Sequence, residues 1–177
     1  MKKLFFSALA VMAFGFAAQA QEDEFPIVGV KAGVNFSNFD SDADTDGATG
    51  FYAGISLDMA LKGHFHFQPE MLYSKEGAKD QSISYLRIPA MAKYYITQGF
   101  NIQLGPVLGA RVDAENKELR KGTKALDYGA AGGLSYELKS GFLIDARYYW
   151  GLEDISRHDE GGKVRNNCIQ VGLGYRF

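Results

Sequence analysis

The segment 40–47 reads DSDADTDG and carries a carboxylate at every second position. Carboxylate oxygens spaced in this way before a glycine are ligands that Ca²⁺ prefers, and Asp42, Asp44 and Asp46 match the start of an EF-hand loop. An EF-hand loop closes with a bidentate glutamate, and the corresponding position here is Ala53. The calcium motif is therefore incomplete, and a solvated acidic loop accounts for the same residues.

A second segment holds the residue types of a nucleophilic or acid/base site, namely Ser156, His158, Asp159 and Glu160. Serine–histidine–aspartate chemistry needs a preorganised geometry, which neighbouring residues of one loop rarely have. The chain also contains no GxSxG or HExxH motif. We therefore predict no catalytic residue and no enzymatic activity, with a lipid-modifying enzyme as the remaining enzymatic alternative.

Three further residues could bind a metal or react as a nucleophile. His64 and His66 have the i, i+2 spacing that places both on one face of a strand, where a polar role is simpler than metal ligation because no further ligands accompany them. Cys168 is the chain's single cysteine, so an internal disulfide is excluded. We expect it to be a small packed residue facing inward, and we expect no cofactor.

A basic segment lies between the acidic segment 40–47 and the segment 156–160. Its charged residues are Lys117, Arg120, Lys121 and Lys124, with Glu115 and Glu118 among them. Such a cluster could contact lipopolysaccharide phosphates, and a solvated charged loop is the simpler interpretation. The whole chain of 177 residues has a formal charge of -2, which gives no support for nucleic-acid binding.

The first twenty residues have the features of a secretory signal peptide. Lys2 and Lys3 precede an apolar run, and Ala18-Gln19-Ala20 forms a small-x-small cleavage site. We predict cleavage after Ala20, which leaves residues 21–177 as one exported domain. No cysteine follows the site, so a lipoprotein anchor is not expected.

The rest of the chain alternates apolar and polar residues with a period of two, which predicts β-strands. Val28, Val30 and Val34, for example, share one face, while Lys31 and Asn35 share the other. The pattern recurs in eight segments: 28–36, 51–59, 65–74, 86–96, 100–112, 126–138, 142–151 and 169–177. The sequence therefore predicts an all-β fold of eight strands.

The predicted connections alternate in length. Short turns are expected at 62–63, 97–99 and 139–141, and longer polar loops at 38–49, 76–82, 113–125 and 153–164. This arrangement is typical of an eight-stranded antiparallel transmembrane up-and-down β-barrel of the bacterial outer membrane, with short periplasmic turns and longer extracellular loops. Both termini would then be periplasmic, and outer-membrane lipid and lipopolysaccharide would surround the barrel.

A soluble, lipocalin-like periplasmic ligand binder would show the same alternation with its apolar face inside. Two features favour an apolar face turned toward lipid. The polar faces are rich in glycine, which suits a crowded lumen. Aromatic residues gather near both ends of the apolar faces, such as Phe51 and Trp150 toward the long loops and Phe65 and Phe142 toward the short turns.

The C-terminus supports the same interpretation. Gln170, Gly172, Tyr175 and Phe177 have the spacing of the C-terminal insertion signal that the barrel-assembly machinery reads, which this segment resembles. We therefore expect this machinery to be a partner during insertion.

Charged residues of both signs fall on the polar faces. The expected lumen residues are Lys31, Arg87, Lys93, Arg111, Arg147 and Arg176 with Asp58, Glu70, Asp113, Asp127, Glu137 and Asp145. Buried charges persist when they are paired, so we predict a salt-bridge network that closes the lumen. Proline removes a backbone donor, so bulges or rim positions are expected at Pro69, Pro89 and Pro106.

Several segments resemble the PorT-like outer-membrane β-barrel proteins. The resemblance is carried by 29–39 (GVKAGVNFSNF), 68–77 (QPEMLYSKEG), 85–89 (YLRIP), 127–133 (DYGAAGG) and 148–152 (YYWGL). It implies this barrel and no catalytic residue, and it implies a possible protein-secretion partner. The predicted function is a structural or surface-recognition role, with an accessory role in a secretion or transport complex as the alternative.

Overall fold

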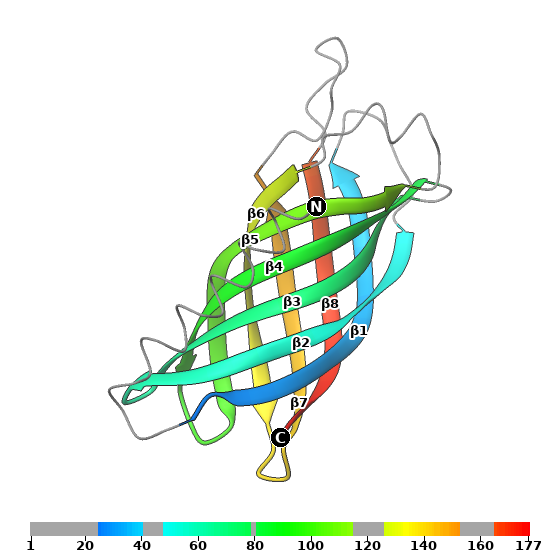
Figure 1. The fold of residues 1–177 in the computed structure, drawn as a ribbon. Coiled ribbons are helices and arrows are strands. Elements are labelled where there is room, and N and C mark those ends of the chain that lie inside the picture. The colour runs from blue at the N-terminus through cyan, green and yellow to red at the C-terminus, as the bar shows by residue number, and fades with distance from the viewer. Residues whose placement is uncertain (1–24, 41–47, 79–80, 115–125, 153–164) are drawn as a thin grey trace.

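The computed structural model describes residues 25–40, 48–78, 81–114, 126–152 and 165–177. They form one closed barrel of eight antiparallel strands, in which each strand pairs with the next and β8 pairs with β1 (Figure 1). The strands are β1 (Ile27–Asp40), β2 (Ala48–Lys62), β3 (Phe65–Ala78), β4 (Gln81–Tyr95), β5 (Phe100–Ala114), β6 (Leu126–Glu137), β7 (Phe142–Gly151) and β8 (Arg165–Arg176). Within these ranges no helix is long and apolar enough to cross a bilayer.

Three short turns join β2 to β3, β4 to β5 and β6 to β7, as the sequence predicts. Each contains a glycine with positive φ, at Gly63, Gly99 and Gly141, a conformation that residues with a Cβ rarely adopt. These turns lie at the end of the barrel where β1 begins and the chain ends (Figure 1). We call this the turn end and the opposite end the loop end.

The predicted second loop, 76–82, is wrong. β3 continues to Ala78 and β4 begins at Gln81, with Glu76 paired to Ile83. The strands β2 to β5 have 14 or 15 residues, more than the 9–11 that cross a bilayer. Strand residues outside the hydrocarbon need no apolar face, so the alternation that predicts strands is lost there although the pairing continues.

The apolar faces point outward. Leu104 and Leu173 are 62% and 63% exposed, whereas Lys31, Glu70 and Arg147 are at most 3% exposed. This is the reverse of a lipocalin, so the soluble ligand-binder alternative is wrong. An apolar outer surface beside a charged interior is the arrangement of a barrel in lipid.

Aromatic side chains contact one another near both ends of the outer surface. Toward the loop end, the Tyr148 and Trp150 ring centroids are 4.7 Å apart. Toward the turn end, Tyr175 packs against Phe142 and Phe177, with centroids 5.1 and 5.2 Å apart. Two aromatic girdles of this kind mark the two interfaces of a membrane barrel.

The prolines interrupt the ladders without shifting the register. The pairing of β2 with β3 is broken between Ser56 and Met59, opposite Pro69, and resumes in phase. The pairing of β3 with β4 is likewise broken beside Pro89, and that of β4 with β5 beside Pro106, and both resume in phase. The expected bulges lie elsewhere, between Ala60 and Lys62 and between Ser84 and Tyr85. A missing N–H removes one rung, and the closed barrel holds the register on both sides of the gap.

Candidate functional site: the polar lumen

The middle of the lumen holds a central cluster of two cations and two carboxylates, Lys31, Glu70, Asp145 and Arg147. Arg147 donates two hydrogen bonds to Glu70, from Nη1 to Oε2 at 2.8 Å and from Nη2 to Oε1 at 3.0 Å. Its Nε donates to Asp145 Oδ2 at 3.2 Å, and Lys31 Nζ lies 3.3 Å from Glu70 and 3.2 Å from Asp145. Because all four side chains are at most 1% exposed, the cluster is a neutral, dehydrated core.

A turn-end cluster closes the barrel below this level. Lys93 Nζ lies 2.6 Å from both Asp58 and Glu137, so one ammonium bridges β2 and β6 across the lumen. Arg176 Nη1 contacts Glu137 at 2.7 Å and Asp58 at 3.6 Å. His66 Nδ1 lies 2.6 Å from Asp58 and completes the cluster from β3.

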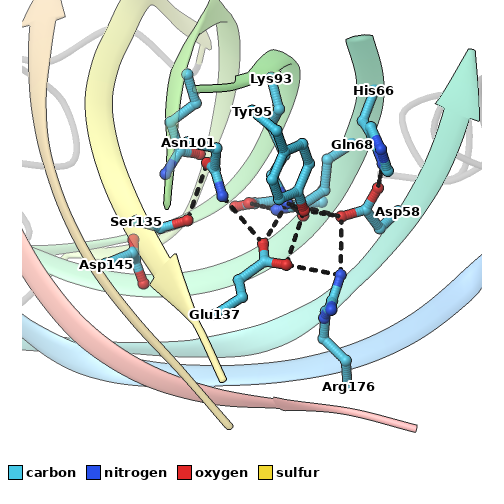
Figure 2. A network of polar contacts seen from close by, with 12 residues as sticks. Asp58, His66, Gln68, Lys93, Tyr95, Asn101, Ser135, Glu137, Asp145 and Arg176 are labelled. Atoms are coloured by element: carbon cyan, nitrogen blue, oxygen red, sulfur yellow. Dashed lines mark hydrogen bonds and ion pairs between the residues drawn. The ribbon is translucent and has the colours of Figure 1, made fainter. Parts of the chain in front are cut away.

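Tyr95 occupies the middle of the turn-end cluster (Figure 2). Its hydroxyl donates to Glu137 Oε2 at 2.7 Å and accepts from Lys93 Nζ at 3.1 Å. The His66 ring lies 4.5 Å from the Tyr95 ring, centroid to centroid. The cluster therefore seals the mouth with hydrogen-bonded charges and an aromatic ring.

The loop-end cluster contains one cation and two carboxylates. Arg87 Nε donates to Glu76 Oε1 at 2.7 Å, and its Nη2 lies 2.9 Å from Asp127 Oδ2. Its guanidinium also lies between two rings, 4.7 Å from the Tyr85 centroid and 4.1 Å from the Tyr149 centroid. Stacking on both faces and pairing at the edge hold this arginine across the lumen.

An apolar cluster covers part of the inner wall at this level. It is formed by Met91, Val107, Ala131, Tyr149 and Cys168, one residue from each of the strands β4 to β8. All five are at most 2% exposed. Cys168 is thus a packed inward residue, and apolar side chains fill part of the lumen beside the ionic clusters.

Glu76 is a buried lumen carboxylate that the sequence prediction missed. It falls in the predicted second loop, yet it is 2% exposed and forms the tightest contacts of Arg87. Ser74 and Glu76 keep the inward face polar, but Lys75 makes the outward face polar as well, so the apolar–polar alternation that predicts a strand ends before Glu76. On the inward face, Ser74 donates to Glu76 at 2.6 Å.

Two predicted lumen residues lie at the rim. Arg111 is half-buried and pairs with Tyr85 at the loop end of β5, and Asp113 is exposed. The register shifts between Ser84 and Tyr85 of β4. Opposite this shift, β5 contains one extra residue, Val112, which lies between Arg111 and Asp113. A bulge of this kind turns the following side chain away from the face that alternation predicts.

The insertion-signal residues have separate positions in β8 and after it. Gln170 donates to Asn35 Oδ1 in the lumen at 3.0 Å, and Gly172 faces Tyr52. Tyr175 belongs to the turn-end girdle, and the Phe177 N–H donates to Val28. The last residues thus close the β8–β1 seam, and their recognition by the assembly machinery stays a prediction.

The two histidines do not share a face, so that prediction is wrong. His64 lies in the turn, with its ring 5.9 Å from Tyr94, while His66 faces the lumen. The turn breaks the period of two. Among the described residues, no group of three or more histidine, cysteine or carboxylate side chains could hold a metal.

The other sequence candidates lie outside the described residues. These are residues 1–20, the acidic residues Asp42, Asp44 and Asp46, the basic residues Lys117, Arg120, Lys121 and Lys124, and the residues Ser156, His158, Asp159 and Glu160.

Comparison with known proteins agrees with this geometry. The family model of the outer membrane protein beta-barrel domain matches residues 6–177. The chain belongs to this family. The match is to the outer membrane protein beta-barrel domain as such, so the likeness to the PorT-like group stays a prediction. A comparison with curated proteins finds no match.

Three solved structures with the same fold are distant in sequence. Neisserial surface protein A is 19% identical over 85% of this outer-membrane barrel and 97% of that chain, with a TM-score of 0.52. The attachment invasion locus protein Ail of Yersinia pestis is 18% identical over 87% of this chain and 100% of that one, with a TM-score of 0.53. A de novo designed transmembrane β-barrel, 11% identical over 88% of this chain and 99% of that one, has a TM-score of 0.52. At these identities the likeness is one of fold.

Proposed function

We propose that this outer-membrane barrel is a non-conducting, non-enzymatic scaffold that presents the segments joining its strands at the loop end for recognition outside the cell. The observation that carries the proposal is the filled lumen. Lys31, Lys93 and Arg147 are each at most 3% exposed and each contact two carboxylates. An ion crossing this lumen would have to break several dehydrated pairs in turn.

Conductance in planar bilayers tests the closed lumen. The wild-type protein is expected to show no steady unitary current, because buried ion pairs bridge the lumen at several levels. The variant Glu70→Ala/Arg147→Ala removes one carboxylate and one cation, and with them three contacts of the central cluster, without changing net charge, and we expect current fluctuations from it. Steady conductance of the wild type would contradict the proposal.

A pull-down from native outer membranes tests the recognition role. We expect no stoichiometric outer-membrane or periplasmic partner. A stable complex retained in detergent would replace the scaffold role with the accessory role in a secretion or transport complex. Exchanging the loop-end segments for short turns provides the control, since a partner held by them would be lost while the barrel remains.

The proposal includes export by a cleaved leader. Intact mass spectrometry of the protein purified from outer membranes is expected to give a chain that begins at Gln21, because Ala18 and Ala20 supply the small residues that signal peptidase reads. A mass that retains residues 1–20 would contradict this. Protease added to intact cells tests the orientation: cleavage is expected only in the loop-end segments, with both termini protected in the periplasm.

A further inference from the structure

The turn-end mouth of the barrel holds a cavity of about 850 Å³. Its lining combines His66, Tyr95, Glu137 and Arg176 of the turn-end cluster with Lys139 of the turn between β6 and β7. The cluster therefore separates the cavity from the rest of the lumen. This volume lies within the range of sites that bind small organic molecules.

The cavity has an excess of positive charge. Within the turn-end cluster, the cations Lys93 and Arg176 balance the carboxylates Asp58 and Glu137. Lys139 adds one more cation, because it is exposed and forms no ion pair with any residue in the described strands and turns. Low-dielectric walls focus the field of a charge inside a cleft, so the cavity favours an anion over a cation.

Arg176 supplies a hydrogen-bond donor that the turn-end cluster does not use. Its Nη1 contacts Glu137 at 2.7 Å and Asp58 at 3.6 Å, and its side chain stays 22% exposed at the mouth (Figure 2). The Nε of the same guanidinium has no hydrogen-bond partner among the described residues. An N–H without an acceptor is unfavourable, and the planar edge of a guanidinium fits a carboxylate well.

The lining also has an apolar part, to which Ile27 and Leu138 belong. An aliphatic group in contact with these residues would be removed from water, which favours binding. The excess of one positive charge matches a singly charged acid better than a phosphate ester, which carries about -1.5 to -2 charges at pH 7.

We propose that the turn-end cavity binds a small organic acid, with its carboxylate between Lys139 and Arg176 and its aliphatic body against the apolar part of the lining. Glu137 does not repel this carboxylate strongly, because Lys93 and Arg176 neutralise it at 2.6 and 2.7 Å. The site is separate from the loop end, where the proposed recognition takes place.

Hexanoate is the probe, and hexanamide, which has the same aliphatic body without the charge, is the control ligand. The protein is purified from outer membranes and placed in nanodiscs, with empty nanodiscs correcting for partition into lipid. By calorimetry we expect saturable binding of hexanoate with a Kd of about 1 mM or below. Hexanamide is expected to bind about tenfold more weakly, because its hydrogen bonds are not charge-assisted. Hexanoate is also expected to shift the Arg176 Nε–Hε NMR signal.

The variant Lys139→Gln tests the cation that the cluster does not balance. Lys139 is exposed in a turn, so the barrel is expected to fold, and hexanoate is expected to bind about three- to fivefold more weakly. The matched control is Lys62→Gln, which makes the same change at an exposed residue of the turn end outside the lining. Its Kd is expected to stay within about twofold of the wild type. Heat-modifiable gel migration confirms that each variant is folded.

Three results would each overturn the proposal. The first is the absence of saturable hexanoate binding, and the second is equal affinity for hexanoate and hexanamide, which would make the cavity merely apolar. The third is an equal loss of affinity in the Lys139 and Lys62 variants, which would reduce the attraction to the general charge of the turn end. Oleic acid added to the nanodisc lipid then distinguishes the source of the acid. Displacement of hexanoate assigns the site to a membrane fatty acid, and continued hexanoate binding assigns it to a soluble acid; both results support the site.

Discussion

Glu70→Gln is expected to destabilise the barrel by about 3–5 kcal/mol, the cost of breaking a buried ion pair by removing one partner. Glu70 accepts both terminal nitrogens of Arg147 and contacts Lys31. Without its charge, Asp145 alone faces two cations that water does not reach. Urea titration of the protein folded in lipid vesicles measures the change in free energy of unfolding.

Asp113→Asn is the matched control, since it makes the same chemical change at an exposed carboxylate of β5. We expect about 0–1 kcal/mol there, the usual contribution of a charge whose interactions are exposed to solvent. A Glu70 variant as stable as this control would mean that water or a rearranged pair replaces the carboxylate, and the lumen would then be hydrated rather than closed.

Gly172→Ala is expected to cost about 1–3 kcal/mol through overpacking. A Cβ at this position would overlap the Tyr52 hydroxyl and lie 2.9 Å from the Ala32 carbonyl oxygen. The Tyr52 ring also closely approaches Gly33, where a Cβ would lie 2.6 Å from Cε1. Tyr52 can therefore lie over β1 and reach β8 along the inner wall because the residues beneath it, Gly33 and Gly172, are both glycines. The same urea titration measures the effect.

A double-mutant cycle separates packing from insertion. Tyr52→Phe removes the overlapping hydroxyl, so the double variant is expected to be less destabilised than the sum of the single variants. If Gly172→Ala instead damaged the C-terminal insertion signal, a change in β2 would not relieve the defect. The destabilisation of the double variant would then equal the sum of the two single variants. Gly132→Ala is the control, because its Cβ would meet only side-chain atoms, at 3.2 Å or more, and a small effect is expected.

Most of the fold was predictable because a period of two is a local property. In β6 and β7 the burial pattern alternates along the strand, and the three turn glycines lie where the sequence predicts short turns. Prediction failed where the local signal ends. Beyond the bilayer β3 and β4 carry polar residues on both faces, so Glu76 read as part of a loop although it is a buried partner of Arg87.

The lumen charges were predictable as a set but not as pairs. Lys31 of β1 reaches Glu70 of β3, and Arg147 of β7 reaches the same carboxylate from the far wall. Neither contact joins neighbouring strands, so no spacing along the chain indicates it. The Arg111 and Asp113 positions depend in the same way on a bulge whose location is set by pairing with β4.

By itself the sequence determined eight two-faced strands, the tight turns and an interior of nearly balanced charge, because each is encoded in residues a few positions apart. Tertiary structure alone decided which cation meets which carboxylate, where the apolar cluster lies and how the mouth is sealed. These contacts depend on the stagger and curvature that strands acquire when the sheet closes on itself, and those quantities belong to the whole barrel rather than to any strand.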